Sequence, residues 1–98
     1  MIKHLKNQDL EQTFRMYWDN ALEPGGFAMA VLANDLLGAA QRADVWNRSE
    51  LATIAQWVYH NAPPGSWGSY QIVDNWLSRN PDFENWQKRR VIDLLSTP

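Results

Sequence analysis

The chain has 98 residues, of which 45% are hydrophobic and 20% charged, and its formal net charge is −2. This composition is typical of a globular protein and excludes a disordered or fibrous chain. The absence of cysteine excludes a disulfide scaffold, a thiol nucleophile and any zinc site that needs thiolate ligands. The length predicts a single domain, residues 1–98, with one modest core.

Charge is also balanced along the chain. Residues 1–49 carry five basic and six acidic side chains and residues 50–98 carry four and five, so each half has a net charge of −1. Proteins that bind nucleic acid usually have a basic excess on one face. The balance therefore disfavours nucleic acid as a partner.

One uncharged stretch has the length of a membrane span. Residues 51–73 contain no Asp, Glu, Lys or Arg, but Pro63, Pro64, Gly65 and Gly68 lie in their middle. A bilayer would leave the backbone of such a segment without hydrogen-bond partners. We therefore predict no membrane span, and the lack of a signal-peptide pattern at the N-terminus predicts a cytosolic protein.

The hydrophobic periodicity is helical from the start of the chain. Apolar residues recur every four positions from Leu10 to Leu22, which predicts a first helix that Asn7 or Asp9 caps and that stops at residues 23–26. Residues 27–43 are rich in Ala, Leu and Met, and they predict one central second helix.

Three further helices follow in the second half. The run from Asn47 to Glu50 has the layout of a capping box and predicts a third helix that ends near Asn61. Ser69 can cap a short fourth helix, and Asn80-Pro81 predicts the start of a fifth that continues nearly to the C-terminus. No alternating strand pattern is present, so the predicted fold is all-α, a compact bundle of four or five helices.

Six tryptophans are many for a chain of this length. Four of them lie on predicted apolar faces and are expected in the core: Trp18, Trp57, Trp76 and Trp86. Trp46 and Trp67 lie in predicted connections and are candidate interaction residues. Trp67, in a Pro- and Gly-rich turn, either folds back as a plug over the third and fourth helices, which we favour, or serves as an interface anchor.

Asn34 and Asp35 are polar residues inside the most apolar predicted helix. A buried carboxylate is costly unless it is paired, so Asp35 either points outward, or accepts bonds from a neighbouring helix start or from Arg42. The alternative places Asn34 and Asp35 at the polar floor of a ligand pocket. Asp44 is expected to cap or brace the helix that begins near Asn47.

The chain offers little that predicts catalysis. His4 lies in a terminus expected to fray, and His60 lies at a helix end, where the helix dipole explains it. A triad of His60 with Ser66 or Ser69 and Asp74 lacks the strand–turn–helix elbow that serine hydrolases use. Neither a His-x-x-x-His pair nor a nucleotide-binding glycine loop is present. We therefore expect no enzymatic activity, no metal and no cofactor.

Lys88, Arg89 and Arg90 form the one basic cluster. Three consecutive residues spread around most of a helix, and the turn over residues 62–68 is too long for a helix-turn-helix motif. These three residues are weak candidates for nucleic-acid contact.

The middle of the chain, about residues 25–77, contains a series of short motifs: Gly26-Phe27, Asn34-Asp35-Leu36, Ala43-Asp44, Asn47, Ala62-Pro63, Trp67-Gly68-Ser69 and Trp76-Leu77. With these motifs the chain resembles a family of small proteins encoded by tailed bacteriophages and prophages. The resemblance implies the cytoplasm of a phage-infected bacterium as the setting and no catalytic residue. It also implies that Asn34, Asp35, Asp44 and Asn47 hold the scaffold or form a shared site.

These observations lead to one functional hypothesis and two alternatives. The first is a small non-enzymatic phage accessory protein that binds a host or immune-system protein, as an inhibitor of bacterial defence or in host takeover. The alternatives are a nucleic-acid-associated phage regulator that uses Lys88, Arg89 and Arg90, and a small-ligand protein with a pocket at Asn34 and Asp35. A homodimer is compatible with all three.

Overall fold

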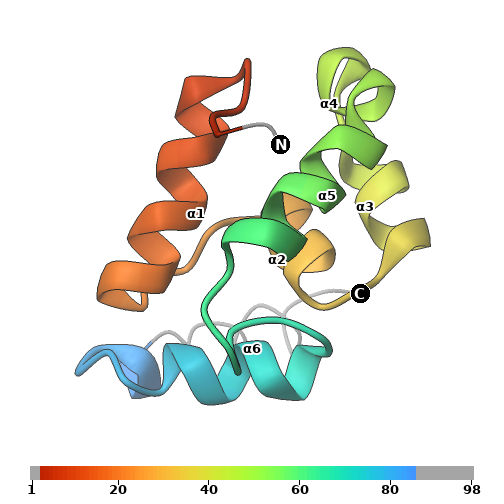
Figure 1. Ribbon diagram of the computed structural model, residues 1–98. Helices are drawn as coiled ribbons and strands as arrows, with labels where there is room; N and C mark the ends of the chain where they lie inside the picture. The colour runs from red at the N-terminus through yellow and green to blue at the C-terminus, as the bar shows by residue number, and fades with distance from the viewer. Residues whose placement is uncertain (1–2, 86–98) are drawn as a thin grey trace, which may run out of the picture.

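The computed structural model describes residues 3–85, and this part of the chain folds into six α-helices joined by short connections (Figure 1). The helices are α1 (Gln8–Asn20), α2 (Gly26–Leu32), α3 (Leu36–Arg42), α4 (Val45–Ser49), α5 (Leu51–Asn61) and α6 (Tyr70–Leu77). No strand occurs between residues 3 and 85. The all-α class and the single small domain are therefore confirmed.

Helix α1 begins as the sequence predicts. The side chain of Asn7 accepts a hydrogen bond from the Leu10 amide at 3.1 Å and so satisfies one of the amides that a helix start leaves unpaired. The helix ends at Ala21, which has a φ of 51° and donates its own amide to the Tyr17 carbonyl at 2.9 Å. This left-handed residue turns the chain toward α2 before the Pro-Gly-Gly segment is reached.

The single helix predicted over residues 27–43 is wrong, because α2 and α3 are separate. Asn34 has a φ of 59°, a left-handed conformation that Asn tolerates better than most residues and that ends α2. The next residue, Asp35, starts α3 by accepting a hydrogen bond from the Gly38 amide at 2.9 Å. The two polar residues thus form the break between two helices. Asp35 accepts its bond from the start of its own helix, α3, and not from the start of a neighbouring helix as expected.

The capping box predicted at Asn47 is also absent. Asp44 is the residue that caps, because its carboxylate accepts the Asn47 amide at 2.7 Å, and the cap lies three residues earlier than predicted. Asn47 lies inside α4, and Trp46 lies on this helix instead of in a connection. The predicted third helix is interrupted at Glu50, after which α5 begins, and only its end at Asn61 agrees with the prediction.

Helix α6 is capped by Ser69, whose hydroxyl accepts the Ile72 amide at 3.1 Å, as predicted. The connection before it is tied to two earlier helices. The Tyr17 hydroxyl donates to the Ser66 carbonyl at 2.9 Å, and the Gly68 amide donates to the Leu32 carbonyl at 2.7 Å. Most of the predicted fifth helix, including Trp86, lies outside the described residues.

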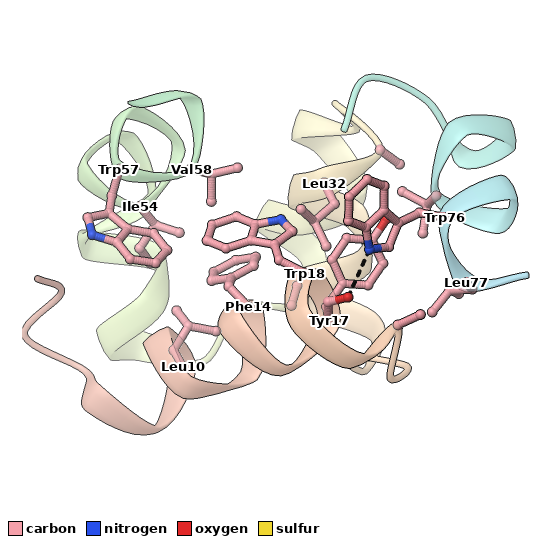
Figure 2. Close-up of a cluster of buried hydrophobic side chains, with 14 of the residues drawn as sticks. Leu10, Phe14, Tyr17, Trp18, Leu32, Ile54, Trp57, Val58, Trp76 and Leu77 are labelled. Atoms are coloured by element: carbon pink, nitrogen blue, oxygen red, sulfur yellow. Dashed lines mark hydrogen bonds between the residues drawn. The ribbon is translucent and has the colours of Figure 1, made fainter. Parts of the chain in front are cut away.

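An aromatic cluster forms the centre of the core (Figure 2). The Trp18 ring stacks on Trp57 with centroids 5.4 Å apart, and Phe14 lies 5.9 Å from both rings. Trp76 donates its indole N–H to the Tyr17 carbonyl at 2.9 Å and brings α6 against α1. The predicted core positions of Trp18, Trp57 and Trp76 are confirmed, since each is at most 8% exposed.

Candidate functional site

A cavity lies between the N-terminal segment and helices α4 and α5. We call it the α4 groove; its volume is about 640 Å³. A cavity of this size is in the range of ligand and peptide pockets. It is lined by His4, Leu5, Lys6, Asn7, Asp44, Trp46, Asn47, Glu50, Thr53 and Ile54.

One wall of the α4 groove is α4 with its two flanking acidic residues. Asp44 caps the helix, and Glu50 follows its last turn with its amide donating to the Trp46 carbonyl at 3.2 Å. Side chains four residues apart lie on the same helix face, so Trp46 and Glu50 are neighbours. Trp46 is 79% exposed, which is unusual for the side chain with the largest apolar surface.

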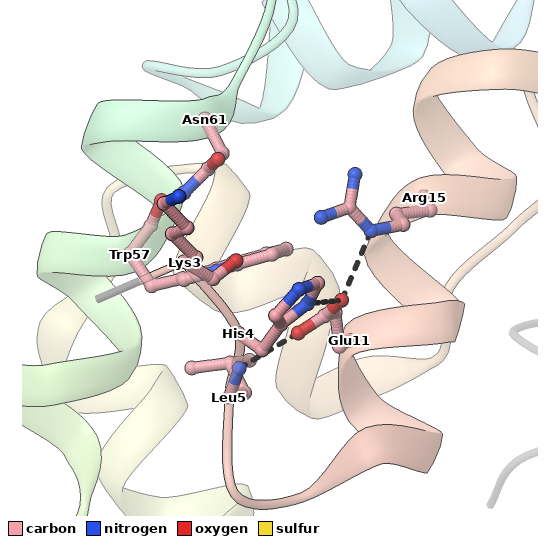
Figure 3. A network of polar contacts seen from close by, with 7 residues as sticks. All are labelled: Lys3, His4, Leu5, Glu11, Arg15, Trp57 and Asn61. Carbon is pink, nitrogen blue, oxygen red and sulfur yellow. Dashed lines mark hydrogen bonds and ion pairs between the residues drawn. The ribbon is translucent and has the colours of Figure 1, made fainter. Parts of the chain in front are cut away.

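The opposite wall is the N-terminal segment, residues 4–7, which Glu11 holds in place (Figure 3). The Glu11 carboxylate accepts the Leu5 amide at 2.7 Å and the Arg15 Nε–H at 3.1 Å, and His4 Nδ1 lies 2.9 Å from it. Trp57 adds a fourth contact by donating its indole N–H to the Lys3 carbonyl at 3.2 Å. The expectation that His4 lies in a frayed terminus is therefore wrong, because this segment is bonded to α1 and α5.

These contacts keep Glu11 charged. The hydrogen bond from His4 lowers the pKa of Glu11 to about 2, with further lowering by the Leu5 amide and by Arg15 against the opposing effect of burial. Glu11 is only 9% exposed and Leu5 only 5%. The wall of the groove thus rests on a buried carboxylate whose lone pairs are shared among three donors.

Contacts across the groove mouth are looser. The Asn7 side-chain amide donates to Asn47 Oδ1 at 3.4 Å, and Lys6 Nζ lies 3.9 Å from Glu50 Oε1. Lys6 is 91% exposed, so solvent screens this ion pair and its contribution to stability is small. Leu5 anchors the N-terminal wall to the core, whereas α4 has no buried residue, and these two contacts between the walls are weak.

Asn34 and Asp35 lie in a different place, a smaller hollow of about 330 Å³ between the start of α3 and α5. Its other lining residues are apolar: Val31, Leu36, Ala39, Leu51, Ala52 and Ala55. Asp35 is engaged by two donors, the Gly38 amide and the Tyr70 hydroxyl, which lies 2.6 Å from its carboxylate. The Tyr70 hydrogen bond, with help from Gly38, lowers the pKa of Asp35, and it raises the pKa of Tyr70.

Asp35→Ala is expected to lower the melting temperature more than Tyr70→Phe does, because it removes both the α3 cap and the contact with α6. Asp35→Asn keeps a capping side chain and should fall between the two. In the Asp35→Ala background, Tyr70→Phe should have almost no further effect. Thermal unfolding followed by circular dichroism measures all four variants, and additive effects of the two substitutions would contradict the contact.

Trp67 lies in a third place. Its ring meets Tyr59 edge-on with centroids 5.8 Å apart, and its half-buried side chain packs against the core. This position agrees with a plug over α5 and α6. The candidate residues therefore divide among three places, and only Asp44, Trp46 and Asn47 line the α4 groove together.

Sequence reasoning missed the residues of the opposite wall, above all Glu11. A signal was present, because Glu11 precedes Phe14 by three residues and Trp18 by seven, which places a carboxylate on the apolar face of α1. A charged residue on such a face needs partners. Arg15 is a partner four residues along the same helix, but the other two, His4 and Leu5, lie in a segment with no sequence signal of order.

The two serines considered for the hypothetical triad have structural roles. Ser66 is buried and donates its hydroxyl to the Pro63 carbonyl at 2.7 Å, while Ser69 caps α6. The exposed ring of His60 meets Tyr59 edge-on. Residues 3–85 contain no group of three or more acidic or histidine side chains arranged to hold a metal ion.

Within the same residues no helix is long and apolar enough to cross a bilayer. The basic cluster Lys88, Arg89 and Arg90 lies outside the described residues.

Comparisons of the chain with protein-family models, with curated proteins and with solved structures found no match.

Proposed function

We propose that this chain is a small non-enzymatic accessory protein of a tailed phage or prophage that acts in the bacterial host cytoplasm by binding a host or immune-system protein. The phage setting comes from the sequence resemblance over residues 25–77. The binding mode is supported by the surface described below, and it requires no cofactor.

The observation that carries the proposal is the exposed apolar surface of α3 and α4. Six large hydrophobic side chains of the described structure are strongly exposed, and four of them lie between residues 36 and 46. Leu37 is 81% exposed, Val45 and Trp46 are each 79% exposed, and Leu36 is 66% exposed. Such a concentration in one short stretch is more typical of an interaction surface than of scattered exposed side chains.

The surroundings of these side chains fit the same function. Leu36 borders the smaller hollow, whose floor continues onto Ala52 and Ala55 of α5, and Trp46 borders the α4 groove. Figure 1 shows α3 and α4 on the side of the molecule opposite α1. Protein interfaces place aromatic anchors beside pockets of this kind, where a few residues contribute most of the binding energy.

The two alternatives have weaker support. A small-ligand pocket at Asn34 and Asp35 would need a carboxylate available to the ligand, whereas Asp35 already accepts bonds from Gly38 and Tyr70. A nucleic-acid regulator would depend on Lys88, Arg89 and Arg90 in a chain whose net charge is −2. Three phosphate contacts would give only a shallow salt dependence and a weak complex.

The affinity-tagged protein, used as bait in lysate of phage-sensitive bacteria, is expected to retain a specific host protein. Leu37→Ser or Trp46→Ser should reduce capture at least tenfold, since the loss of one anchor side chain at an interface typically costs about 2 kcal/mol or more. The exposed Gln41→Ser on α3 is the matched control and should capture normally. Capture of nucleic acid instead, or equal capture by all variants, would contradict the proposal.

A further inference from the structure

We infer that the α4 groove binds an arginine side chain of the partner protein, with its guanidinium between Trp46 and the carboxylates of Asp44 and Glu50. The inference rests on the proposed function, because it assigns the chemistry of the partner at one end of that surface. The bound group is expected to be cationic and planar and to have an apolar stem, because the lining residues fit each of these three properties.

The charge of the lining favours a cation. Asp44 and Glu50 are the two acidic residues of the groove, and Lys6 is the one Lys or Arg. In residues 3–85 no basic side chain lies within ion-pair distance of Asp44, and the Lys6–Glu50 pair is 3.9 Å long. The fourth ionisable lining residue, His4, has its Nδ1 directed at Glu11 on α1. The groove therefore has an unbalanced negative charge on its α4 wall.

The apolar part of the lining favours arginine over a small cation. The floor contains the buried side chains of Leu5 and Ile54, which suit the methylene stem of a long side chain. At the rim, the exposed indole of Trp46 offers a flat face for a guanidinium. Arginine stacks on an aromatic ring and bonds a carboxylate at the same time, which the compact ammonium of lysine does less well.

The chain's own Lys6 reaches Glu50 from across the mouth, where we place the partner's cation. Because Lys6 is almost fully exposed and the contact is long, an incoming guanidinium can displace it at little cost. Lys6 then acts as an internal competitor. Its removal should strengthen binding, whereas removal of Glu50's charge should weaken it, and these opposite signs make the inference testable.

The test titrates the whole protein with the peptide N-acetyl-Leu-Arg-Leu-amide and follows the Trp46 indole N–H by NMR. The same peptide with citrulline, a neutral isostere of arginine, should bind at least threefold more weakly. Glu50→Gln should weaken binding of the arginine peptide roughly threefold, and Lys6→Gln should strengthen it roughly twofold, in keeping with exposed ion pairs. The controls are Asp19→Asn and Lys3→Gln, which make the same changes in net charge on exposed residues outside the groove.

The outcomes separate this inference from the proposed function. If the citrulline peptide binds equally well, or if Glu50→Gln behaves like Asp19→Asn, the groove does not select arginine and the inference fails. If a host protein is captured through Leu37 while the arginine peptide leaves the Trp46 signal unchanged, the inference alone fails. If the arginine peptide binds as described but no protein is captured, the groove chemistry is supported and the proposed function fails.

Discussion

Replacing Trp57 with alanine is expected to lower the free energy of unfolding by about 3–5 kcal/mol, the usual cost of removing a buried tryptophan. Trp57 is 1% exposed, and its ring lies against Trp18 and Phe14 of α1. Its indole N–H also bonds the Lys3 carbonyl, so the substitution removes a contact between α5 and the N-terminal segment as well. This loss is a large part of the 5–15 kcal/mol that holds a typical small domain together.

Urea unfolding followed by circular dichroism measures this effect. The matched control is Trp46→Ala, which removes the same side chain from a position that is 79% exposed and should change stability by less than about 0.5 kcal/mol. Equal losses for the two tryptophans would show that Trp57 does not lie in the core as Figure 2 places it.

Glu11→Gln is expected to destabilise the protein by about 1–3 kcal/mol at pH 7. Solvent around His4 and Arg15 weakens their contacts with Glu11 and keeps the loss in this range. The neutral amide keeps the size of the side chain but weakens the bonds from His4, the Leu5 amide and Arg15. Since Leu5 is bonded through this carboxylate, the substitution should also loosen the N-terminal wall of the α4 groove.

The same substitution predicts a pH dependence of defined sign. The pKa of Glu11 is about 2 in the folded protein and near its ordinary value of 4.5 when the chain is unfolded. Its contribution is therefore complete above pH 4.5 and is lost as the pH falls from 4.5 toward 2. The wild-type protein should lose this stability while Glu11→Gln does not, so that their unfolding free energies converge in acid.

Unfolding at pH 7, 5 and 3 tests this prediction, with Asp19→Asn as the control for loss of an exposed carboxylate from the same helix. The control should follow the wild type at every pH. A difference between the wild type and Glu11→Gln that stays constant down to pH 3 would mean that Glu11 is not held in its charged form.

The helix boundaries that a single local signal specifies could be predicted from the sequence. Asn7 and Ser69 cap where expected, because an N-cap depends only on the next three residues. The break at Asn34 and Asp35 was missed for a physical reason. Most of the surrounding residues are Ala and Leu, which favour helix, and the break forms because a left-handed Asn34 and a capping Asp35 act together.

Residues of only one wall of the α4 groove could be predicted from the sequence. Asp44, Trp46 and Asn47 are close in sequence, so a single short helix is enough to bring them together. The opposite wall is separated from them by about forty residues, as the contact between Asn7 and Asn47 shows. Periodicity reports which face of a helix is buried, but it does not report which distant segment covers that face.

The contacts of Tyr17 constrain the order in which a ribosome could complete this fold. Its hydroxyl bonds Ser66 and its carbonyl bonds Trp76, residues that are translated 49 and 59 positions later. Helix α1 can form as soon as it emerges, but its aromatic face has no permanent cover until α5 and α6 have been made. During synthesis the nascent chain thus displays Phe14, Tyr17 and Trp18 for most of its translation, the stage at which it is most exposed to aggregation and to chaperones.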